Sequence, residues 1–271
     1  MIGEATRGSH NISLGGKHPH QIPKFENPVD HRKWVLEHTA GAFRFFGLKQ
    51  FDEGEAGHIS VRDPIDPDTF WINPLGKHFN LIQVSDLVHI NNKGEILPDG
   101  NQHPVNSAGF SIHRALHESR PDINAACHAH SVYGKAWSTF GKPIEMLNQD
   151  ACIFYKKHVV YNQFGGVAID GEEGERIAEA LGEDSNAAIL QNHGLLTVGE
   201  TVDQAAYLFS LLERTCECQL LVESTNLPKN IIPDKEAEYT AFMTQDPETM
   251  FGSFQPYYDY LLKSTGGDFL R

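Results

Sequence analysis

Two histidine motifs offer recognisable chemistry in this chain of 271 residues. The stretch INAACHAHSVYG places His128 and His130 one residue apart at the end of an apolar run, and AAILQNHGLLTVG places His193 just after another. Because successive side chains of a strand point to opposite faces, His128 and His130 share a face. If both runs are strands of one sheet, the three imidazoles can converge on one metal ion and leave it an open position, as a catalytic zinc requires.

The alternative interpretation is that these are unrelated histidines, each hydrogen-bonded near a core. A His-x-His pair is weak evidence here, because the chain has 15 histidines and a second such pair, His18 and His20. That second pair lies in a Gly- and Pro-rich segment without periodicity, so residues 1–28 are predicted to form a flexible arm. Such an arm must be ordered before it can hold a metal, and we interpret its histidines as incidental.

The elements that must position the three histidines are buried strands over residues 123–127 and 186–190, each followed by turn or cap residues. Apolar spacing predicts helices over 30–47, 107–120, 131–137, 171–181 and 202–223, with Ser107, Ser131 and Thr201 as caps. Short strands are expected at 58–61, 69–72 and 87–90, a hairpin turn at 92–95, and further helices from about 234. The pattern favours one α+β or α/β domain over 29–271.

Composition limits the class of protein. Hydrophobic residues make up 40% and charged residues 21%, as in globular proteins. The net charge of −14 argues against a nucleic-acid partner, and no apolar run approaches the roughly 20 residues that span a membrane. The four cysteines form no CxxC motif, which indicates reduced thiols and a cytoplasmic protein.

The longer motifs resemble the class II aldolase/adducin family, and more closely its adducin-like branch. The matching stretches are GHISVRDP, FWINPLGKHF, NSAGFSIHRALHESRPDINAACHAHSVYGKAWS and AILQNHGLLTVGETVDQAAYLFSLLERTCECQ. They occur in the family's order and cover about residues 29–223. The combination is far more specific than any single stretch.

The resemblance implies a three-layer α/β/α fold with a central, largely antiparallel sheet, assembled as a homotetramer. It also implies that His128, His130 and His193 bind a divalent metal, usually Zn²⁺, with Fe²⁺ or Mn²⁺ as alternatives. Such an ion coordinates the oxygens of a small-molecule substrate and stabilises an enolate formed from it. The expected activity is that of a metal-dependent carbon–carbon lyase of aldolase or decarboxylase type.

The chain departs from the family pattern at several positions. The resemblance places the acid/base residue of the sugar-phosphate aldolases at Gly109, which cannot carry a proton. Of the phosphate-binding pattern Gly76 and Ser107 persist, but Ala108 replaces a serine, and His58 stands where an asparagine is usual. We therefore expect a small, non-phosphorylated oxo or hydroxy acid as substrate.

The missing acid must be replaced by water or by another side chain, for which His58, Tyr133 and His113 are the catalytic candidates. Asn73 and Gly76 can present turn backbone to an anionic group, and Ser107 and Gly109 are expected to line the substrate site.

Two other functions remain open. An adducin-like interaction module would carry a vestigial or structural metal, although keeping three buried imidazoles without a ligand is costly for a fold. A non-haem iron oxygenase could use the same three histidines, because imidazole suits iron as well as zinc.

Overall fold

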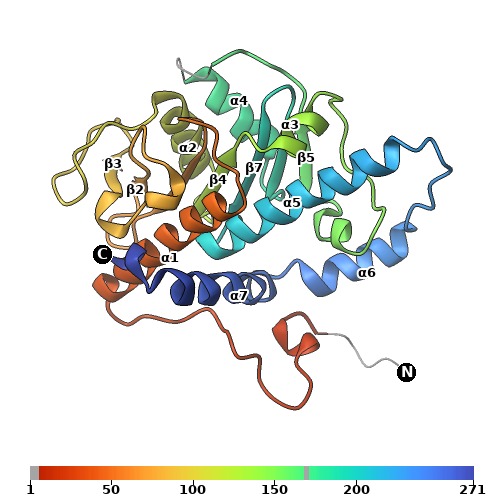
Figure 1. Cartoon of the computed structure of the whole chain (residues 1–271), viewed down its shortest axis with the longest axis horizontal. Coiled ribbons are helices and arrows are strands. Elements are labelled where there is room, and N and C mark those ends of the chain that lie inside the picture. Colours follow the sequence, from red (N-terminus) through yellow and green to blue (C-terminus); the bar gives the residue numbers. More distant parts are fainter. Residues whose placement is uncertain (1–5, 168–170) are drawn as a thin grey trace.

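A sheet of seven strands runs through the part of the chain that the computed structural model describes, residues 6–167 and 171–271 (Figure 1). The strand order is β3-β2-β1-β4-β7-β6-β5, and of the neighbouring pairs only β5 and β6 are parallel. The strands are β1 (His58–Arg62), β2 (Thr69–Ile72), β3 (Val88–Asn91), β4 (Ala125–Ala129), β5 (His158–Tyr161), β6 (Ala187–Leu190) and β7 (Gly194–Gly199).

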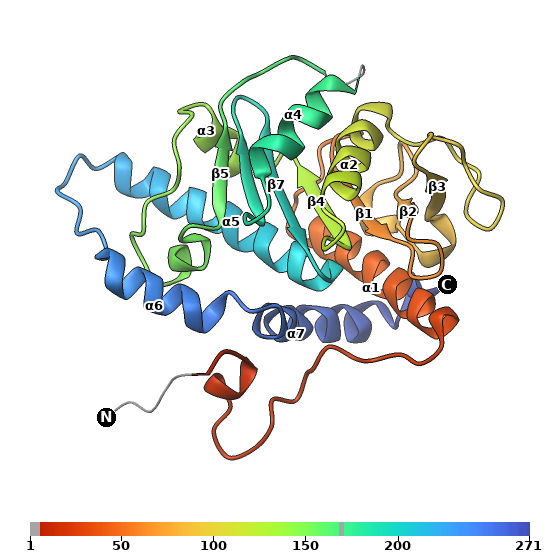
Figure 2. The same ribbon diagram turned by 180° about the vertical axis from the view of Figure 1, so that it is seen from behind.

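Helices cover both faces of this sheet (Figure 2). One face carries α2 (Ser107–Ser119) and α4 (Glu172–Leu181), and the other carries α1 (Pro28–Leu48), α3 (Val132–Ser138) and α5 (Val202–Glu223). Outside α1 and α5 lies α7 (Pro247–Thr265), and α6 (Asp234–Thr244) precedes it. Short 3₁₀ helices span Ser9–Ile12, Phe79–Leu81, Val84–Asp86, Asp150–Phe154 and Asp268–Leu270. The predicted three-layer fold with a largely antiparallel sheet is confirmed.

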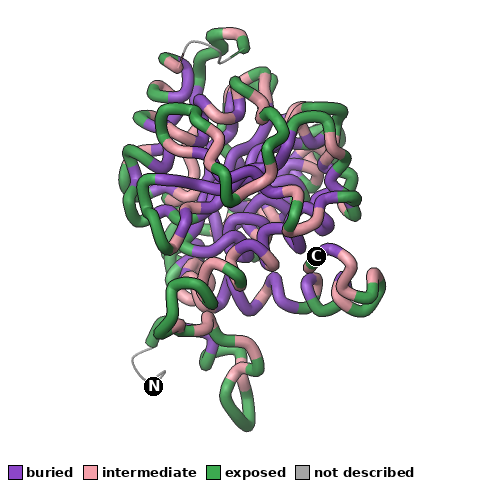
Figure 3. The backbone as a smooth tube through the Cα atoms, turned by 90° about the vertical axis from the view of Figure 1, so that its left-hand side faces the viewer, coloured by how far each residue is buried: buried purple, intermediate pink, exposed green. Residues whose placement is uncertain are grey.

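Strand alternation divides the interior into two main cores. Ile59 and Val61 of β1 face the core under α1, α5 and α7, whereas Ala126 of β4 and Val198 of β7 face the core under α2 and α4. In Figure 3 the buried residues are concentrated in the middle of the molecule, while the segment toward the N-terminus lies at the outside. His58 and Ser60, which alternate with Ile59 and Val61, therefore face α2.

Most of the predicted elements lie where the spacing places them, including α5 with Thr201 as its cap: the Thr201 side chain accepts from the Gln204 N–H. Two caps differ from the prediction. Ser131 precedes α3 as predicted, but its side chain makes no capping hydrogen bond. Asn106, and not Ser107, caps α2, because its side-chain oxygen accepts from the Gly109 N–H over 3.0 Å. Asparagine and serine are equally good caps, so the sequence Asn106-Ser107 alone does not show which of the two caps the helix.

The sequence analysis missed β5 and β7. The two apolar runs that precede the histidines do share one sheet, but they are not neighbours, because β7 lies between β4 and β6. His193 lies in the turn that joins β6 to β7. Within the described residues, no helix is both long and apolar enough to cross a membrane.

Candidate metal centre

His128 presents an unpartnered ring nitrogen near the end of β4. The side chain is buried, and its Nδ1 donates a hydrogen bond to the Leu195 carbonyl on β7 over 2.8 Å. A proton on Nδ1 leaves a lone pair on Nε2, and this buried Nε2 has no hydrogen-bond partner. An unpaired buried polar atom is destabilising. A carbonyl on the far nitrogen is also the usual support of a metal-binding imidazole.

The structure brings the other two predicted ligands to the same place. His130 follows β4 directly. His193 lies in the turn before β7, and the pairing of β7 with β4 brings this turn close to the end of β4. Gly194 permits the close approach, because a Cβ there would lie only 2.8 Å from the Ala129 carbonyl oxygen. One candidate ligand nitrogen from each histidine lies within 4.8 Å of the others.

This donor set fits a divalent cation. Imidazole nitrogens are common ligands of Zn²⁺, and three of them within 4.8 Å of one another can share one ion. Burial lowers the pKa of His193 to about 4 and, with the nearby Lys135 ammonium, lowers that of His130. The three imidazoles are therefore neutral at physiological pH, as metal ligands must be.

His58 lies beside these ligands and depends on Gly109 for its place. His58 on β1 is paired with His128 on β4, and the two rings are stacked with centroids 5.5 Å apart. A Cβ at Gly109 would lie 2.4, 2.5 and 2.6 Å from three atoms of the His58 ring. The glycine at 109 and the histidine at 58 are thus two parts of one arrangement, in which the ring fills the space of the missing side chain.

Behind His58 lies a buried polar cluster that does not line the cavity. Ser60 Oγ is 2.6 Å from Nδ1 of His113 and 2.7 Å from Nε2 of His117. Burial lowers the pKa of both histidines to about 3, so both are neutral. His113, a predicted proton donor, is fully buried and meets the edge of His58, with ring centroids 5.5 Å apart at 87°.

The three metal-ligand candidates and His58 open into a cavity of about 330 Å³. One part of its lining is apolar and comes from α2 and from the segment before α4, whereas Lys135 on α3 supplies a cation beside His130. The ammonium of Lys135 is paired with the Glu53 carboxylate. The lining comprises Ala56, His58, Asn106, Ala108, Ile112, His128, His130, Lys135, Phe164, Gly166, Val167, Asn192 and His193.

Asn73 and Gly76 line a different and much smaller cavity. It measures about 10 Å³, which is room for about one water molecule. Asn106 lies between the two cavities and lines both. Ser107 is an exposed first residue of α2 and lines neither of them.

Tyr133 also lies away from the metal cavity. It lines a separate hollow of about 290 Å³ between α3 and α5, beside Glu213. The Glu213 carboxylate holds the start of α3: it accepts from Ser131 Oγ and from the N–H groups of Tyr133 and Gly134. Burial raises the pKa of Glu213, and the hydrogen bonds from these three donors oppose that effect.

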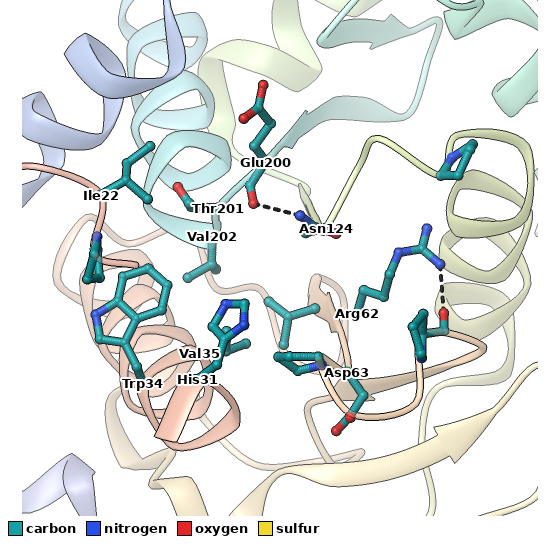
Figure 4. Close-up of a pocket in the computed structure, with 15 residues that line it drawn as sticks. Ile22, His31, Trp34, Val35, Arg62, Asp63, Asn124, Glu200, Thr201 and Val202 are labelled. Carbon is teal, nitrogen blue, oxygen red and sulfur yellow. Dashed lines mark hydrogen bonds between the residues drawn. The ribbon is translucent and has the colours of Figure 1, made fainter. Parts of the chain in front are cut away.

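A larger hollow of about 490 Å³ lies at the opposite ends of the same strands (Figure 4). His31 and Trp34 of α1 form one wall, and Arg62, the last residue of β1, lies on the other side. The Arg62 guanidinium donates hydrogen bonds to backbone carbonyls, including that of Pro67 over 2.8 Å. Within the described residues, the histidines at 128, 130 and 193 are the one group of three side chains placed to hold a metal.

Sequence reasoning missed Lys135, Glu53 and Glu213. Lys135 lies on α3, five residues after His130, and the only available signal was that a helix was predicted directly after the two histidines. Glu53 and Glu213 come from distant segments, and no local pattern connects them to the histidines.

Known proteins share both the sequence and the structure of this chain. Residues 37–220 match the family described as class II aldolase and adducin N-terminal domain. The meiotically up-regulated gene 14 protein of Schizosaccharomyces pombe is 46% identical over 91% of this chain and 96% of its own length. Decarboxylase NovR of Streptomyces niveus is 39% identical over 89% of each chain.

Among solved structures, that of L-fuculose 1-phosphate aldolase from Glaciozyma antarctica superimposes with a TM-score of 0.84. It is 37% identical, over 92% of this chain and 96% of that one. Sequence, fold and the meeting of the three histidines agree: the chain belongs to the class II aldolase/adducin family.

Proposed function

We propose that the protein is a metal-dependent carbon–carbon lyase, of aldolase or decarboxylase type, acting on a small, non-phosphorylated oxo or hydroxy acid. The observation that carries the proposal is the buried, unpartnered Nε2 of His128, which lies beside the candidate ligand nitrogens of His130 and His193 at a cavity. A bound Zn²⁺, or Fe²⁺ or Mn²⁺, would supply a Lewis acid that polarises the substrate carbonyl.

The residues around the ligands support an acid as substrate. Lys135 is the cation at the cavity, and it can exchange its contact with Glu53 for the substrate carboxylate. His58 lies where it can hold a proton that leaves the substrate and return it to the product carbon. The apolar walls at Ala108, Ile112 and Phe164 suit a carbon skeleton that is not heavily hydroxylated.

A phosphorylated sugar fits less well, although the name of the Glaciozyma relative contains one. The cavity at Asn73 and Gly76, where the resemblance implies phosphate binding, has room for about one water molecule. The name of the Streptomyces relative, a decarboxylase, agrees with a reaction that needs no phosphate subsite. We further propose a homotetramer in the cytoplasm, where the four unpaired cysteines would stay reduced.

The test is a metal analysis of protein purified without a nickel column, followed by incubation with a panel of oxo and hydroxy acids. We expect close to one transition metal per chain, and release of carbon dioxide or of an aldol fragment. His193→Ala should lose both the metal and the turnover, because two imidazoles hold an ion far more weakly than three. The exposed His103→Ala is the matched control and should keep both.

Folded protein with less than about 0.1 equivalent of metal would contradict the proposal. An adducin-like interaction module predicts unchanged assembly in His193→Ala and no turnover in either protein. An iron oxygenase predicts oxygen consumption that depends on iron loaded under anaerobic conditions.

A further inference from the structure

Part of the wall of the metal cavity is apolar and comes from two elements. Ala108 and Ile112 lie one helical turn apart on α2, whereas Phe164 and Val167 lie in the segment between β5 and α4. Among the described residues that line the cavity, none is an aspartate, glutamate, serine, threonine or tyrosine. Hydroxyl groups of a ligand would lack hydrogen-bond partners along these four side chains, so the wall favours an apolar group.

Phe164 is the largest side chain of this wall, and 60% of it is exposed. Packing against the rest of the protein therefore fixes little of the ring. A ligand that covers the ring is favoured, because apolar surface then leaves water. The place of the ring must be set mainly by the backbone that carries it.

Glu173 on α4 holds that backbone. Its carboxylate is buried, and Oε1 accepts a hydrogen bond from the N–H of Gly165, the residue after Phe164, over 3.2 Å. Oε2 accepts from the Tyr161 hydroxyl at the end of β5 over 2.9 Å and from the Arg176 guanidinium over 2.7 Å. A Cβ at Gly165 would lie 2.4 Å from Oε2, so glycine is what lets the backbone approach the carboxylate this closely.

The helix that carries Glu173 is itself packed against the other part of the wall. Where α4 meets α2, a Cβ at Gly174 would lie only 2.6 Å from the carbonyl oxygen of Ser111, the residue before Ile112. The carboxylate thus connects the backbone at Phe164 to the helix that carries Ile112. The two parts of the apolar wall are therefore held at a fixed separation.

We propose that Phe164 determines specificity and that Glu173 is its positioning residue: the cavity selects an oxo or hydroxy acid whose remaining group is apolar and packs against Phe164 and Ile112. The choice of an acid rests on the proposed function, whereas the choice of an apolar group rests on the cavity wall. Lys135 and the apolar wall then recognise different parts of one substrate.

Three 2-oxo acids that differ in this group test the selection. Pyruvate, 4-methyl-2-oxopentanoate and phenylpyruvate carry a hydrogen, an isopropyl group and a phenyl ring on the same carbon. Calorimetric titration of the protein loaded with Zn²⁺ gives their dissociation constants. We expect the two larger acids to bind at least about tenfold more tightly than pyruvate, because each buries apolar surface that pyruvate lacks. Equal affinities, or no binding of any of the three, would overturn the proposal.

Phe164→Ala tests the wall directly. The affinity for phenylpyruvate should fall by about tenfold, and that for pyruvate should not change. Phe140→Ala is the matched control and should change neither, because Phe140 is 54% exposed and does not line the cavity. Dissociation of the assembly in Phe164→Ala, with the preference for phenylpyruvate retained, would overturn the proposal, since Phe164 would then be a contact between subunits.

Glu173→Gln tests the positioning role. The single amide oxygen cannot accept from all three donor groups, so the backbone at Gly165 is held less firmly. We expect the same selective loss for phenylpyruvate with unchanged metal content, and no further loss when Glu173→Gln is combined with Phe164→Ala. Additive losses, or an equal loss for pyruvate, would overturn the role of Glu173. Should this variant fail to fold, Gly165→Ala, whose methyl displaces the same backbone, decides instead.

Binding and turnover distinguish this inference from the proposed function. A protein that binds the three acids in the expected order and converts no acid contradicts the proposed function and supports the inference. Conversion of acids without a preference for the apolar group overturns the inference alone.

Discussion

At the scale of single residues, the site is defined by the relation between His58 and Gly109. The glycine in α2 is not an empty position, because the His58 ring occupies the space into which its side chain would project. Taken alone, Gly109 suggests only that the acid/base residue of the sugar-phosphate aldolases has been lost. Considered together, the two positions show that the side chain beside the candidate metal ligands comes from β1, because the His58 ring fills the space next to Gly109 of α2.

Gly109→Ala is therefore expected to destabilise the protein only while His58 is present. The added methyl must displace a buried ring, at a cost of about 1–3 kcal/mol. In the His58→Ala background the same change should be neutral or stabilising by up to about 1 kcal/mol, because alanine favours a helix over glycine. Urea unfolding of the four proteins measures this coupling, and additive effects would contradict the arrangement.

At the scale of elements, α3 is held in place by a carboxylate from α5. Glu213 accepts from one side-chain and two backbone donors at the beginning of α3, directly after His130. A helix of seven residues has little stability of its own, so this contact helps to fix the direction of the chain between His130 and Lys135.

Glu213→Ala should lower the free energy of unfolding by about 2–4 kcal/mol, because it leaves buried donors unpaired. The affinity for metal should also fall by about 10- to 100-fold, as for other residues that support a ligand. Urea unfolding and competition with a chelator measure the two effects. Glu179→Ala, at an exposed position of α4, is the control; if it weakens metal binding equally, Glu213 has no special role.

The elements also show what the sequence could predict. Long periodic segments such as α5, with Thr201 before it, were predictable because cap, apolar spacing and length agree. The strand β7 was not, since GLLTVG is short and begins with a glycine directly after the polar turn that holds His193. The three histidines could be singled out because spacing allowed them to converge and the family resemblance implied them as ligands. Glu213 could not, because its role depends on a contact between residues 79 to 82 positions apart.

At the scale of the whole molecule, the buried neutral histidines make stability depend on pH. Burial lowers the pKa of His113 and His117 to about 3, whereas both titrate near 6.5 when the chain is unfolded. Below pH 6.5, His113 and His117 bind protons in the unfolded chain but stay neutral in the folded protein. The stability that these two residues confer is therefore complete above pH 6.5 and is lost as the pH falls toward 3.

Between pH 6 and pH 4, each of these histidines should lower the free energy of unfolding by about 1.4 kcal/mol per pH unit. His117→Gln removes one of them, so its stability should fall less steeply with acid than that of the unaltered protein. Urea unfolding of metal-free protein at several pH values gives both slopes. Parallel slopes would mean that His117 is protonated in the folded state.

The position of β7 between β4 and β6 links ion capture to folding. His130 follows the end of β4, and His193 immediately precedes β7, so the two sides of the centre meet only when these strands have paired. Before that step the chain offers a cation no more than two neighbouring imidazoles. If these histidines bind a metal as proposed, tight uptake should require the pairing of β4 with β7, and the bound ion should in turn stabilise that pairing against local opening.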